Sequence, residues 1–387
     1  MRSSAVIVAA AAVAAALLAL PLTAGARTAA TPRPLKGIYD ENQVIFGNPD
    51  KVFAELERLR TRLVRIQLVW GGGRGVARRK PTKAADPSDD AYEWGMYDRV
   101  VTFAAKHDIK VMFSVWGTPR WANRGKAQRV APLRGLDLRN FVAAAARRYS
   151  GRYEVGEGDD ARKLPKVHYW LAWNEPNNPV FLWPQFRRVG KRYAIQSGRD
   201  YAKICNAVVA GVRSAKAGQK IACGVTAPRG NNEARGPRPS TSPIYFIRAM
   251  RAAGARGFDA YAHHPYYGRP SETPRTRPPG NVGPTAITLG NLDVLIREVT
   301  RRFGRKPIWI TEYGYQTNPP DRLFGVSTKK QAQYLAQSFA IARKNRRIQM
   351  FVWFLLRDER RLAGWQSGLV TATGRKKPAY NVFRRLG

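Results

Sequence analysis

Residues 307–313 read PIWITEY, a short apolar run that ends in a glutamate and a tyrosine. Its length and its β-branched and aromatic residues are typical of a buried strand. Segments of helical periodicity flank it, at 289–303 before the run and at 329–345 after it. A buried strand between two helices is the repeating unit of α/β proteins, so further copies are expected along the chain.

Strand-like and helix-like segments alternate in this way from residue 35 onward. The expected strands span residues 37–40, 63–70, 109–116, 167–173, 220–226, 258–266, 307–313 and 348–355. The expected helices span residues 52–61, 96–107, 137–149, 191–217, 243–253, 289–303, 329–345 and 379–386. Eight strands, each followed by a helix, predict an α/β fold, a single-domain (β/α)8 TIM barrel. The first strand also lacks the glycine-rich phosphate turn of an open doubly wound sheet.

Long segments rich in Gly, Pro or Arg follow several of the expected strands. They span residues 71–95, 117–135, 174–190, 227–241 and 267–287. Barrel sites are built from the loops at the carboxyl ends of the strands. These long βα loops are therefore where a functional site is expected.

The composition is that of a globular protein with a basic surface. The 387 residues include 67 Lys and Arg but 27 Asp and Glu, which gives a formal charge of +40, and 44% of the residues are hydrophobic. That hydrophobic fraction supports a large core and excludes a disordered basic tail. The basic residues are spread along the sequence, which argues against a nucleic-acid partner. Attraction to an anionic glycan or to the cell envelope remains a hypothesis for the charge.

The first residues have the pattern of a targeting segment. Arg2 precedes an uncharged apolar run at 5–20, and the small residues Ala24, Gly25 and Ala26 follow it. This pattern predicts a signal peptide over 1–26, a short lead-in over 27–34 and the barrel over 35–387. A membrane anchor is the alternative, but the apolar run is short for a span and no cysteine follows it to carry a lipid. The mature protein is thus expected to be secreted, with no membrane span.

Cysteine and histidine are scarce. Cys205 and Cys223 are too few for a disulfide framework or a four-ligand zinc site, and both a single disulfide after export and two packed thiols fit their positions. The four histidines do not form a HExxH motif, so no metal site is predicted. Residues 71–75, GGGRG, lack the Gly-Lys-Ser/Thr ending of a phosphate loop and are interpreted as a βα loop.

Two glutamates stand where apolar strands end. Glu175 lies in residues 170–177, WLAWNEPN, and Glu312 lies in the run quoted first. They are 137 positions apart in the sequence, but a closed barrel brings the ends of its strands to one rim. Two facing carboxylates are the groups that cleave a glycosidic bond, one as acid and one as nucleophile or base. The alternative is that both are ordinary strand-end acids bonded to barrel arginines.

These two motifs resemble those of clan A retaining glycoside hydrolases, such as the family 5 cellulase-like and family 39 xylosidase-like enzymes. In those families an Asn-Glu-Pro sequence ends the fourth strand and a glutamate ends the seventh. The resemblance implies that Glu175 is the acid/base and Glu312 the nucleophile. It implies a secreted hydrolase of O-glycosyl bonds in β-linked poly- or oligosaccharides, acting by retaining double displacement without a metal or organic cofactor.

The resemblance also implies a set of substrate-binding residues. They are Arg65 on the second strand, Asn174 beside the acid, His264 and Tyr266 on the sixth strand, Trp353 on the eighth as the floor of a sugar subsite, and Trp116 along the cleft. Arg65 is expected to hold the nucleophile ionised, and Asn174 to bind the sugar 2-hydroxyl. One feature departs from the cellulase-like pattern, because residues 111–116, VMFSVW, contain no histidine.

A second function class also fits the sequence. A catalytically silent glycan-binding or envelope-associated barrel would bind through its basic surface and would not need the two glutamates for catalysis. Such a protein has no chemical need for both Glu175 and Glu312, so the intact pair favours the enzyme.

Overall fold

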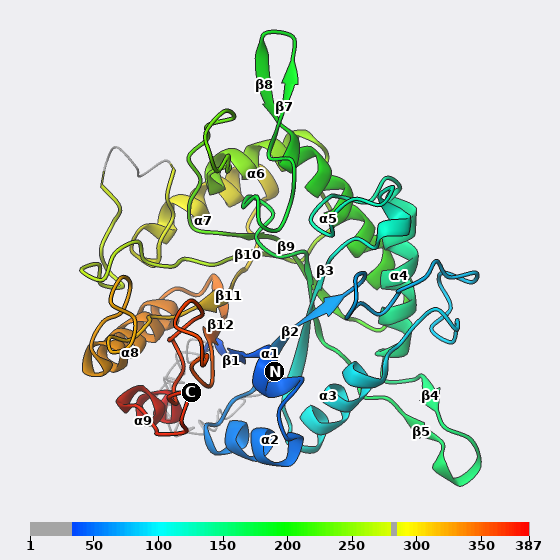
Figure 1. Cartoon of the computed structure of the whole chain (residues 1–387), viewed down its shortest axis with the longest axis horizontal. Helices are drawn as coiled ribbons and strands as arrows, with labels where there is room; N and C mark the ends of the chain where they lie inside the picture. Colours follow the sequence, from blue (N-terminus) through cyan, green and yellow to red (C-terminus); the bar gives the residue numbers. More distant parts are fainter. Residues whose placement is uncertain (1–32, 280–284, 387) are drawn as a thin grey trace, which may run out of the picture. The chain divides into compact units, whose positions relative to one another are not determined.

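The computed structural model describes residues 33–279 and 285–386. Within them, eight parallel strands close into a barrel, in the order β1-β12-β11-β10-β9-β6-β3-β2 (Figure 1). The strands are β1 Leu35–Tyr39, β2 Leu63–Val69, β3 Lys110–Trp116, β6 Tyr169–Ala172, β9 Lys220–Thr226, β10 Ala260–His263, β11 Ile308–Tyr313 and β12 Ile348–Phe354. The predicted (β/α)8 barrel is confirmed, with each strand at its expected place in the sequence.

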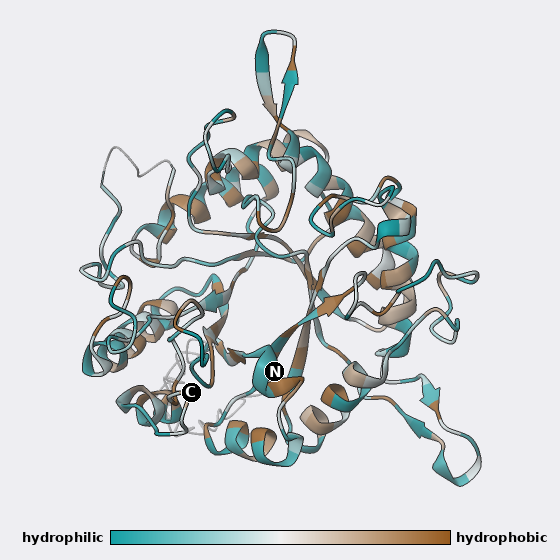
Figure 2. Ribbon diagram, in the orientation of Figure 1, coloured by the Kyte–Doolittle hydropathy of each residue, from teal (hydrophilic) through white to brown (hydrophobic). Residues whose placement is uncertain are grey.

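Helices surround this barrel (Figure 1). They are α1 Glu41–Val44, α2 Pro49–Arg58, α3 Gly95–Lys106, α4 Gly135–Arg148, α5 Gln196–Ser214, α6 Pro243–Ala252, α7 Leu292–Phe303, α8 Thr328–Lys344 and α9 Pro378–Arg385. Short 3-10 helices lie at η1 Arg120–Ala122, η2 Gly158–Asp160 and η3 Leu289–Asn291. Figure 2 shows hydrophobic and hydrophilic bands alternating along the helices, as expected when one helix face packs on the strands.

Two hairpins lie outside the barrel, and one of them corrects a prediction. The strands β4 Glu154–Val155 and β5 Arg162–Lys163 pair between α4 and β6, and β7 Phe186–Val189 pairs with β8 Arg192–Ile195 before α5. The predicted helix over 191–217 therefore begins too early. Gly190 takes a positive φ of 59°, which suits a two-residue hairpin turn and lets the two short strands pair.

Side chains alternate between two cores along each strand. Tyr39, Met350 and Val352 belong to a smaller cluster of strand residues, which fills the barrel interior. Ile38 and Trp353 belong to the large cluster that also contains the apolar helix residues, so they point outward. This alternation decides which strand residues can reach a site on the barrel axis.

A buried lysine ties the first strand to the last helix. The Lys36 side chain is 2% exposed overall, and its Nζ donates to the carbonyls of Leu59, Phe383 and Leu386. Burial lowers the pKa of Lys36 to about 7. These bonds hold the end of α9 against β1, so that the last helix is joined to the first strand.

The predicted signal peptide, residues 1–26, lies outside the described residues, as does most of the predicted lead-in over 27–34. Among the helices that the structure does describe, none is both long and apolar enough to span a bilayer.

Cys205 on α5 and Cys223 on β9 form a disulfide, which decides between the two alternatives that the sequence left open. Both residues are fully buried, and they are 18 positions apart. The bond therefore closes a short loop that joins a helix to the strand that follows it.

We expect the Cys205→Ala, Cys223→Ala double variant to lower the free energy of unfolding by about 3 kcal/mol, because the open loop restores entropy to the unfolded chain. Urea denaturation followed by circular dichroism measures the difference. Wild-type protein unfolded in reducing agent serves as a control and should show a loss of similar size. Equal stability of the oxidised wild type and the double variant would contradict the role given to this bond.

Candidate active site

Glu175 and Glu312 meet at the carboxyl end of the barrel, as the sequence predicts. Glu175 stands three residues after β6, and Glu312 lies in β11. One carboxylate oxygen of each glutamate and a ring nitrogen of His264 all lie within 4.8 Å of one another. The two residues that are far apart in sequence thus face each other across one small space.

Glu312 receives two hydrogen bonds from buried donors. The Arg65 guanidinium donates through Nη1 to Oε2 at 2.8 Å, and the Tyr266 hydroxyl donates to Oε1 at 3.0 Å. A cation and a second donor both favour the ionised carboxylate. The role predicted for Arg65 and the donor role of Tyr266 agree with these contacts.

Local irregularity in β11 aims Glu312 inward. Its pairing with β12 shifts register between Ile310 and Tyr313. As a result the consecutive residues Thr311 and Glu312 both face the barrel interior. Thr311 contacts His264, and Glu312 contacts Arg65. A bulge at the end of a strand is a common way to redirect a functional side chain.

Arg65 also organises the groups around the pair. Its side chain is fully buried, and Nη2 donates to Asn174 Oδ1 at 2.5 Å. The amide oxygen of Asn174 is therefore engaged, which leaves its NH2 group as the donor for a ligand. Arg65 also lies over the ring of Tyr39 at 4.3 Å from the centroid and reaches Ser114 Oγ at 3.4 Å. Ser114 points inward from β3, the strand in which the sequence contains no histidine.

His264 holds Glu175. Its Nε2 lies 3.2 Å from Arg65 Nη1, and a guanidinium can only donate, so this nitrogen accepts and the proton sits on Nδ1. Nδ1 then donates to Glu175 Oε1 at 3.0 Å. Burial lowers the pKa of His264 to about 3, which keeps the ring neutral. Because the ring is fully buried and both nitrogens contact protein groups, the predicted sugar contact of His264 is wrong; it is a positioning residue.

The environment of Glu175 favours a protonated carboxyl. Burial raises the pKa of Glu175 above its ordinary value, while the Asn178 side chain opposes this by donating from Nδ2 to Oε2 at 3.0 Å. Glu312 instead accepts a hydrogen bond from the Arg65 cation, so the two carboxyls have different environments. Such a difference is what divides acid and nucleophile roles between two similar groups.

Glu175 is fixed in place by strained backbone. Glu175 has φ 38° and Trp173 φ 74°, values that non-glycine residues adopt at a cost of about 1–3 kcal/mol each. The Glu175 N–H donates at 2.9 Å to the carbonyl of Val225, which itself has φ 48°. The strained backbone at the rim of the barrel therefore sets the direction of the Glu175 side chain.

The prediction for Trp353 is wrong. Trp353 is fully buried in the strand–helix layer, and its Nε1 donates to the Ser367 carbonyl at 2.9 Å. Strand alternation explains this, because Met350 and Val352 take the inward positions. The exposed aromatic beside the nucleophile is instead Trp365, which is 40% exposed and lies 5.7 Å from the Tyr266 ring.

Trp116 lies at the end of β3 and is partly exposed. Its Nε1 donates to the Phe181 carbonyl at 3.3 Å, and its ring lies 6.2 Å from that of Trp173. It therefore borders the loop that carries Glu175. Its predicted place along the cleft agrees with this position, and its contact with a sugar stays a prediction.

Several site residues were not foreseen from the sequence. Asn178 stands three positions after Glu175, and Glu41 directly follows the first strand, so position alone could have suggested both. Glu41 Oε1 accepts the Gln67 N–H at 2.5 Å, and burial raises the pKa of Glu41 to about 7. Trp365 gives no such signal, because it lies ten residues beyond the expected last strand.

Glu175, His264 and Glu312 are also the group of described residues that could hold a metal ion. The contacts do not favour an ion there. The His264 atom that faces the carboxylates carries a proton, and Arg65 already supplies positive charge to Glu312. A metal ion would have to displace the proton on His264 and lie beside the positive charge of Arg65.

A family model matches residues 139–387, about two thirds of the sequence. The chain belongs to a family of unknown function, DUF5722. The matched segment contains Glu175, His264, Tyr266 and Glu312, while Arg65 lies before it. No curated protein sequence matches the chain.

Solved structures of glycoside hydrolases share the barrel. A family 39 glycoside hydrolase from Bacteroides cellulosilyticus is 18% identical, with a TM-score of 0.60 over 92% of this chain and 63% of its own. A glucosidase from Croceicoccus marinus is 12% identical, with a TM-score of 0.62 over 91% of this chain and 65% of its own. A β-xylosidase from Caulobacter crescentus is 14% identical, with a TM-score of 0.57 over 91% of this chain and 67% of its own. At these identities the likeness shows the fold, a closed (β/α)8 barrel.

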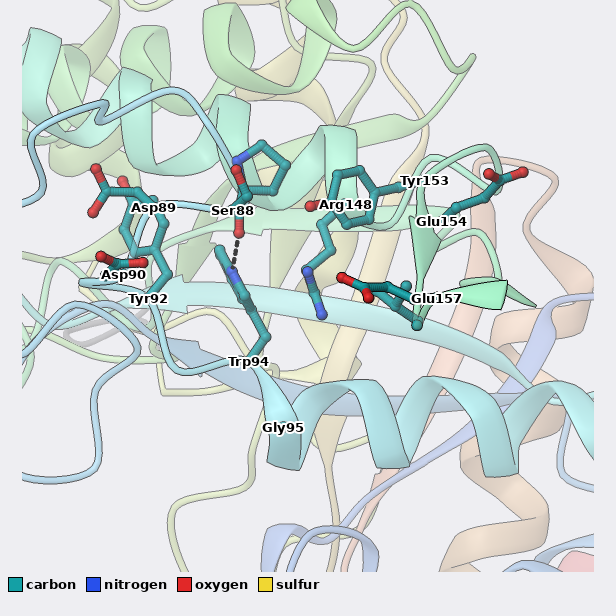
Figure 3. Close-up of a pocket in the computed structure, with 13 residues that line it drawn as sticks. Ser88, Asp89, Asp90, Tyr92, Trp94, Gly95, Arg148, Tyr153, Glu154 and Glu157 are labelled. Atoms are coloured by element: carbon teal, nitrogen blue, oxygen red, sulfur yellow. Dashed lines mark hydrogen bonds between the residues drawn. The ribbon is translucent and has the colours of Figure 1, made fainter. Parts of the chain in front are cut away.

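A separate cavity of about 550 Å³ lies away from the carboxylate pair (Figure 3). Trp94, Tyr153 and Arg148 line it together with Asp90 and Glu157, and Trp94 Nε1 donates to the Pro87 carbonyl at 2.8 Å. It shares no residue with the pair. Chemistry, and not the size of a hollow, therefore locates the candidate active site.

We expect Arg65→Met to lower the free energy of unfolding by about 3–5 kcal/mol, because Glu312 then keeps a buried charge without its cation. In the Glu312→Gln background the same change should cost at least about 1 kcal/mol less, since no charge is left unpaired. Urea denaturation of the four proteins of this cycle measures the coupling. Strictly additive losses would show that the ion pair does not organise the site.

Proposed function

We propose that this protein is a retaining glycoside hydrolase that acts on β-linked oligo- or polysaccharides. One observation carries the proposal: two carboxyls within reach of one anomeric centre, Glu312 held by a cation and Glu175 buried with a raised pKa. Glycosidic cleavage needs this combination of an ionised and a protonated carboxyl.

The chemistry has two balanced steps. Glu175 donates its proton to the glycosidic oxygen while the bond from that oxygen to the anomeric carbon breaks, and Glu312 bonds to the same carbon as a glycosyl ester. Water then attacks this carbon, Glu175 takes the proton of the water, and the ester bond to Glu312 breaks. Arg65 and Tyr266 stabilise Glu312 as it leaves, and His264 Nδ1–H stabilises Glu175 while it is ionised.

The spacing of the carboxyls supports retention of configuration. Retaining enzymes hold the two groups about 5 to 5.5 Å apart, whereas inverting enzymes need roughly 6.5 Å or more for an intervening water. One oxygen of each glutamate lies within 4.8 Å of the other, and this close approach favours the closer class. Asn174, whose amide NH2 is left free by the bond from Arg65, is suited to the sugar 2-hydroxyl.

The solved structures with this barrel lend further support. They include a family 39 glycoside hydrolase, a glucosidase and a β-xylosidase. Their common chemistry agrees with the pair of carboxyls in this chain. Carbohydrate is therefore the substrate class that we propose.

We also propose that the protein is secreted after removal of residues 1–26. The sequence of those residues supports this, and so does the buried disulfide between Cys205 and Cys223, because such bonds persist in oxidising surroundings.

Substitution of each glutamate tests the proposal. We expect Glu312→Gln to remove turnover of aryl β-glycosides, and Glu175→Gln to lower kcat by about 10²–10⁴-fold on substrates with a sugar leaving group. With a dinitrophenyl leaving group, which needs no acid, the first step should be largely spared in Glu175→Gln. Glu154→Gln, an exposed glutamate on β4, is the matched control and should keep full activity. Turnover that is indifferent to both catalytic substitutions would refute the proposal.

The pH profile tests the acid directly. Because Glu175 must be protonated in the free enzyme, kcat/KM should fall as pH rises through its raised pKa, above the range of an ordinary glutamate. Asn178→Ala removes a hydrogen bond to the ionised form, so it raises this pKa and should move the alkaline limb to higher pH. A limb that stays in place, or moves to lower pH, would show that Asn178 does not act on the acid.

A further inference from the structure

Three loops surround Glu175 on the side where a leaving group departs. In the barrel, β6 lies between β3 and β9, so the loops after these three strands flank Glu175. The Asn177 side chain accepts the Ala227 N–H at 2.7 Å and donates to the Thr241 carbonyl at 2.9 Å. The Trp183 N–H donates to the Arg129 carbonyl at 2.8 Å. Since the acid protonates the leaving oxygen, the aglycone of a substrate must pass these loops.

The same three loops carry positive charge with almost no acid. Residues 117–136 contain four Arg and one Lys, residues 176–199 contain four Arg and one Lys, and neither segment contains Asp or Glu. Residues 227–242 contain three Arg and one Glu. In the part of the chain that the structure describes, no carboxylate lies within ion-pair distance of Arg129, Arg187 or Arg238. On α7, by contrast, Arg297 and Arg302 both have acidic partners.

Exposed aromatic rings stand among these arginines. Trp183 is 38% exposed, with the Arg129 guanidinium 5.6 Å from its ring centroid. Tyr193 is 41% exposed, with Arg235 at 5.6 Å. Tyr193 belongs to the hairpin β7–β8, which projects from the barrel (Figure 1) and lengthens this side. Aromatic faces suit sugar rings, and free guanidinium groups suit carboxylates or sulfates.

The Glu312 side has a second carboxyl close to the nucleophile. The segment after β1 contributes Asp40 and Glu41, and Glu41 lies near Arg65 and Glu312 with its carboxylate bonded to the Gln67 N–H. An anionic sugar bound over Glu312 would face the carboxyl of Glu312 and, above a pH of about 7, an ionised Glu41, so this side suits a neutral glycone.

We propose that the substrate has a neutral sugar at the cleaved position and an acidic polysaccharide chain on the leaving side, held by Arg129, Arg238 and the hairpin β7–β8. This deepens the proposed function and rests on it. The charge of the protein is then partly a substrate-binding feature, placed next to the acid.

The test compares acidic chains with the same chains after carboxyl reduction, which removes the charge and preserves the backbone. Hyaluronan alternates neutral and acidic sugars, and glucuronoxylan is a neutral xylose chain with acidic side groups. Polymannuronate, in which every sugar is acidic, is the third substrate. Release of reducing ends is measured at low salt and at about 0.5 M NaCl, where the Debye length falls to roughly 4 Å.

We expect at least one of the mixed chains to be cleaved about 10-fold faster than its reduced form at low salt, with the ratio approaching one at high salt. Polymannuronate should be a poor substrate, because its glycone is charged. The Arg129→Gln, Arg238→Gln double variant should lower the acidic-to-reduced ratio by about 5-fold or more. The Arg343→Gln, Arg346→Gln double variant changes exposed arginines at the opposite end of the barrel and should leave the ratio unchanged.

The other outcomes overturn either this inference alone or the proposed function as well. Equal rates on acidic and reduced chains, or a preference that salt does not change, overturn this inference while the glycosidase stands. Tighter binding of single-stranded DNA than of any acidic chain by the Glu312→Gln variant overturns it in favour of a nucleic-acid surface. No turnover of any chain or aryl glycoside overturns the proposed function and the inference together.

Discussion

The buried guanidinium of Arg65 is the group on which the candidate site depends. It bonds to Glu312, to Asn174 and to the accepting nitrogen of His264, and through His264 it reaches Glu175. One fixed cation therefore orients both carboxyls and selects the histidine tautomer. It can do so because Leu63 and Arg65 occupy successive inward positions of β2, where the barrel wall excludes water.

This arrangement separates the chemical character of two identical side chains. Both glutamates are largely buried, yet Glu312 has a cation and a phenol as donors, whereas Glu175 has neutral donors. Burial raises the pKa of Glu175, and Arg65 and Arg238 oppose this without bonding to it, whereas Glu312 accepts a hydrogen bond from the Arg65 guanidinium. The strained backbone at Glu175 and Val225 fixes the direction of the Glu175 side chain. The strain is tolerated because the closed sheet supports the rim on both sides.

The fold and the carboxylate pair could be predicted from sequence, because both depend on local patterns that repeat. Eight apolar runs predicted eight strands, and a barrel necessarily brings their ends together. The errors arose where a single position matters. Trp353 points outward by strand parity, and a bulge in β11 shows that parity cannot be counted across a rim. The 191–217 helix was extended into β8 because helical periodicity does not reveal a two-residue turn at Gly190.

Loop side chains escaped prediction for a related reason. Trp365 owes its position to how a whole loop packs, which no spacing rule encodes. The same holds for the positive charge. Along the sequence the arginines look evenly spread, but closing the barrel gathers the loops after β3, β6 and β9 around the acid and leaves Glu41 beside the nucleophile. A dispersed linear charge is thus concentrated around the acid, and the order of strands in the barrel brings it there.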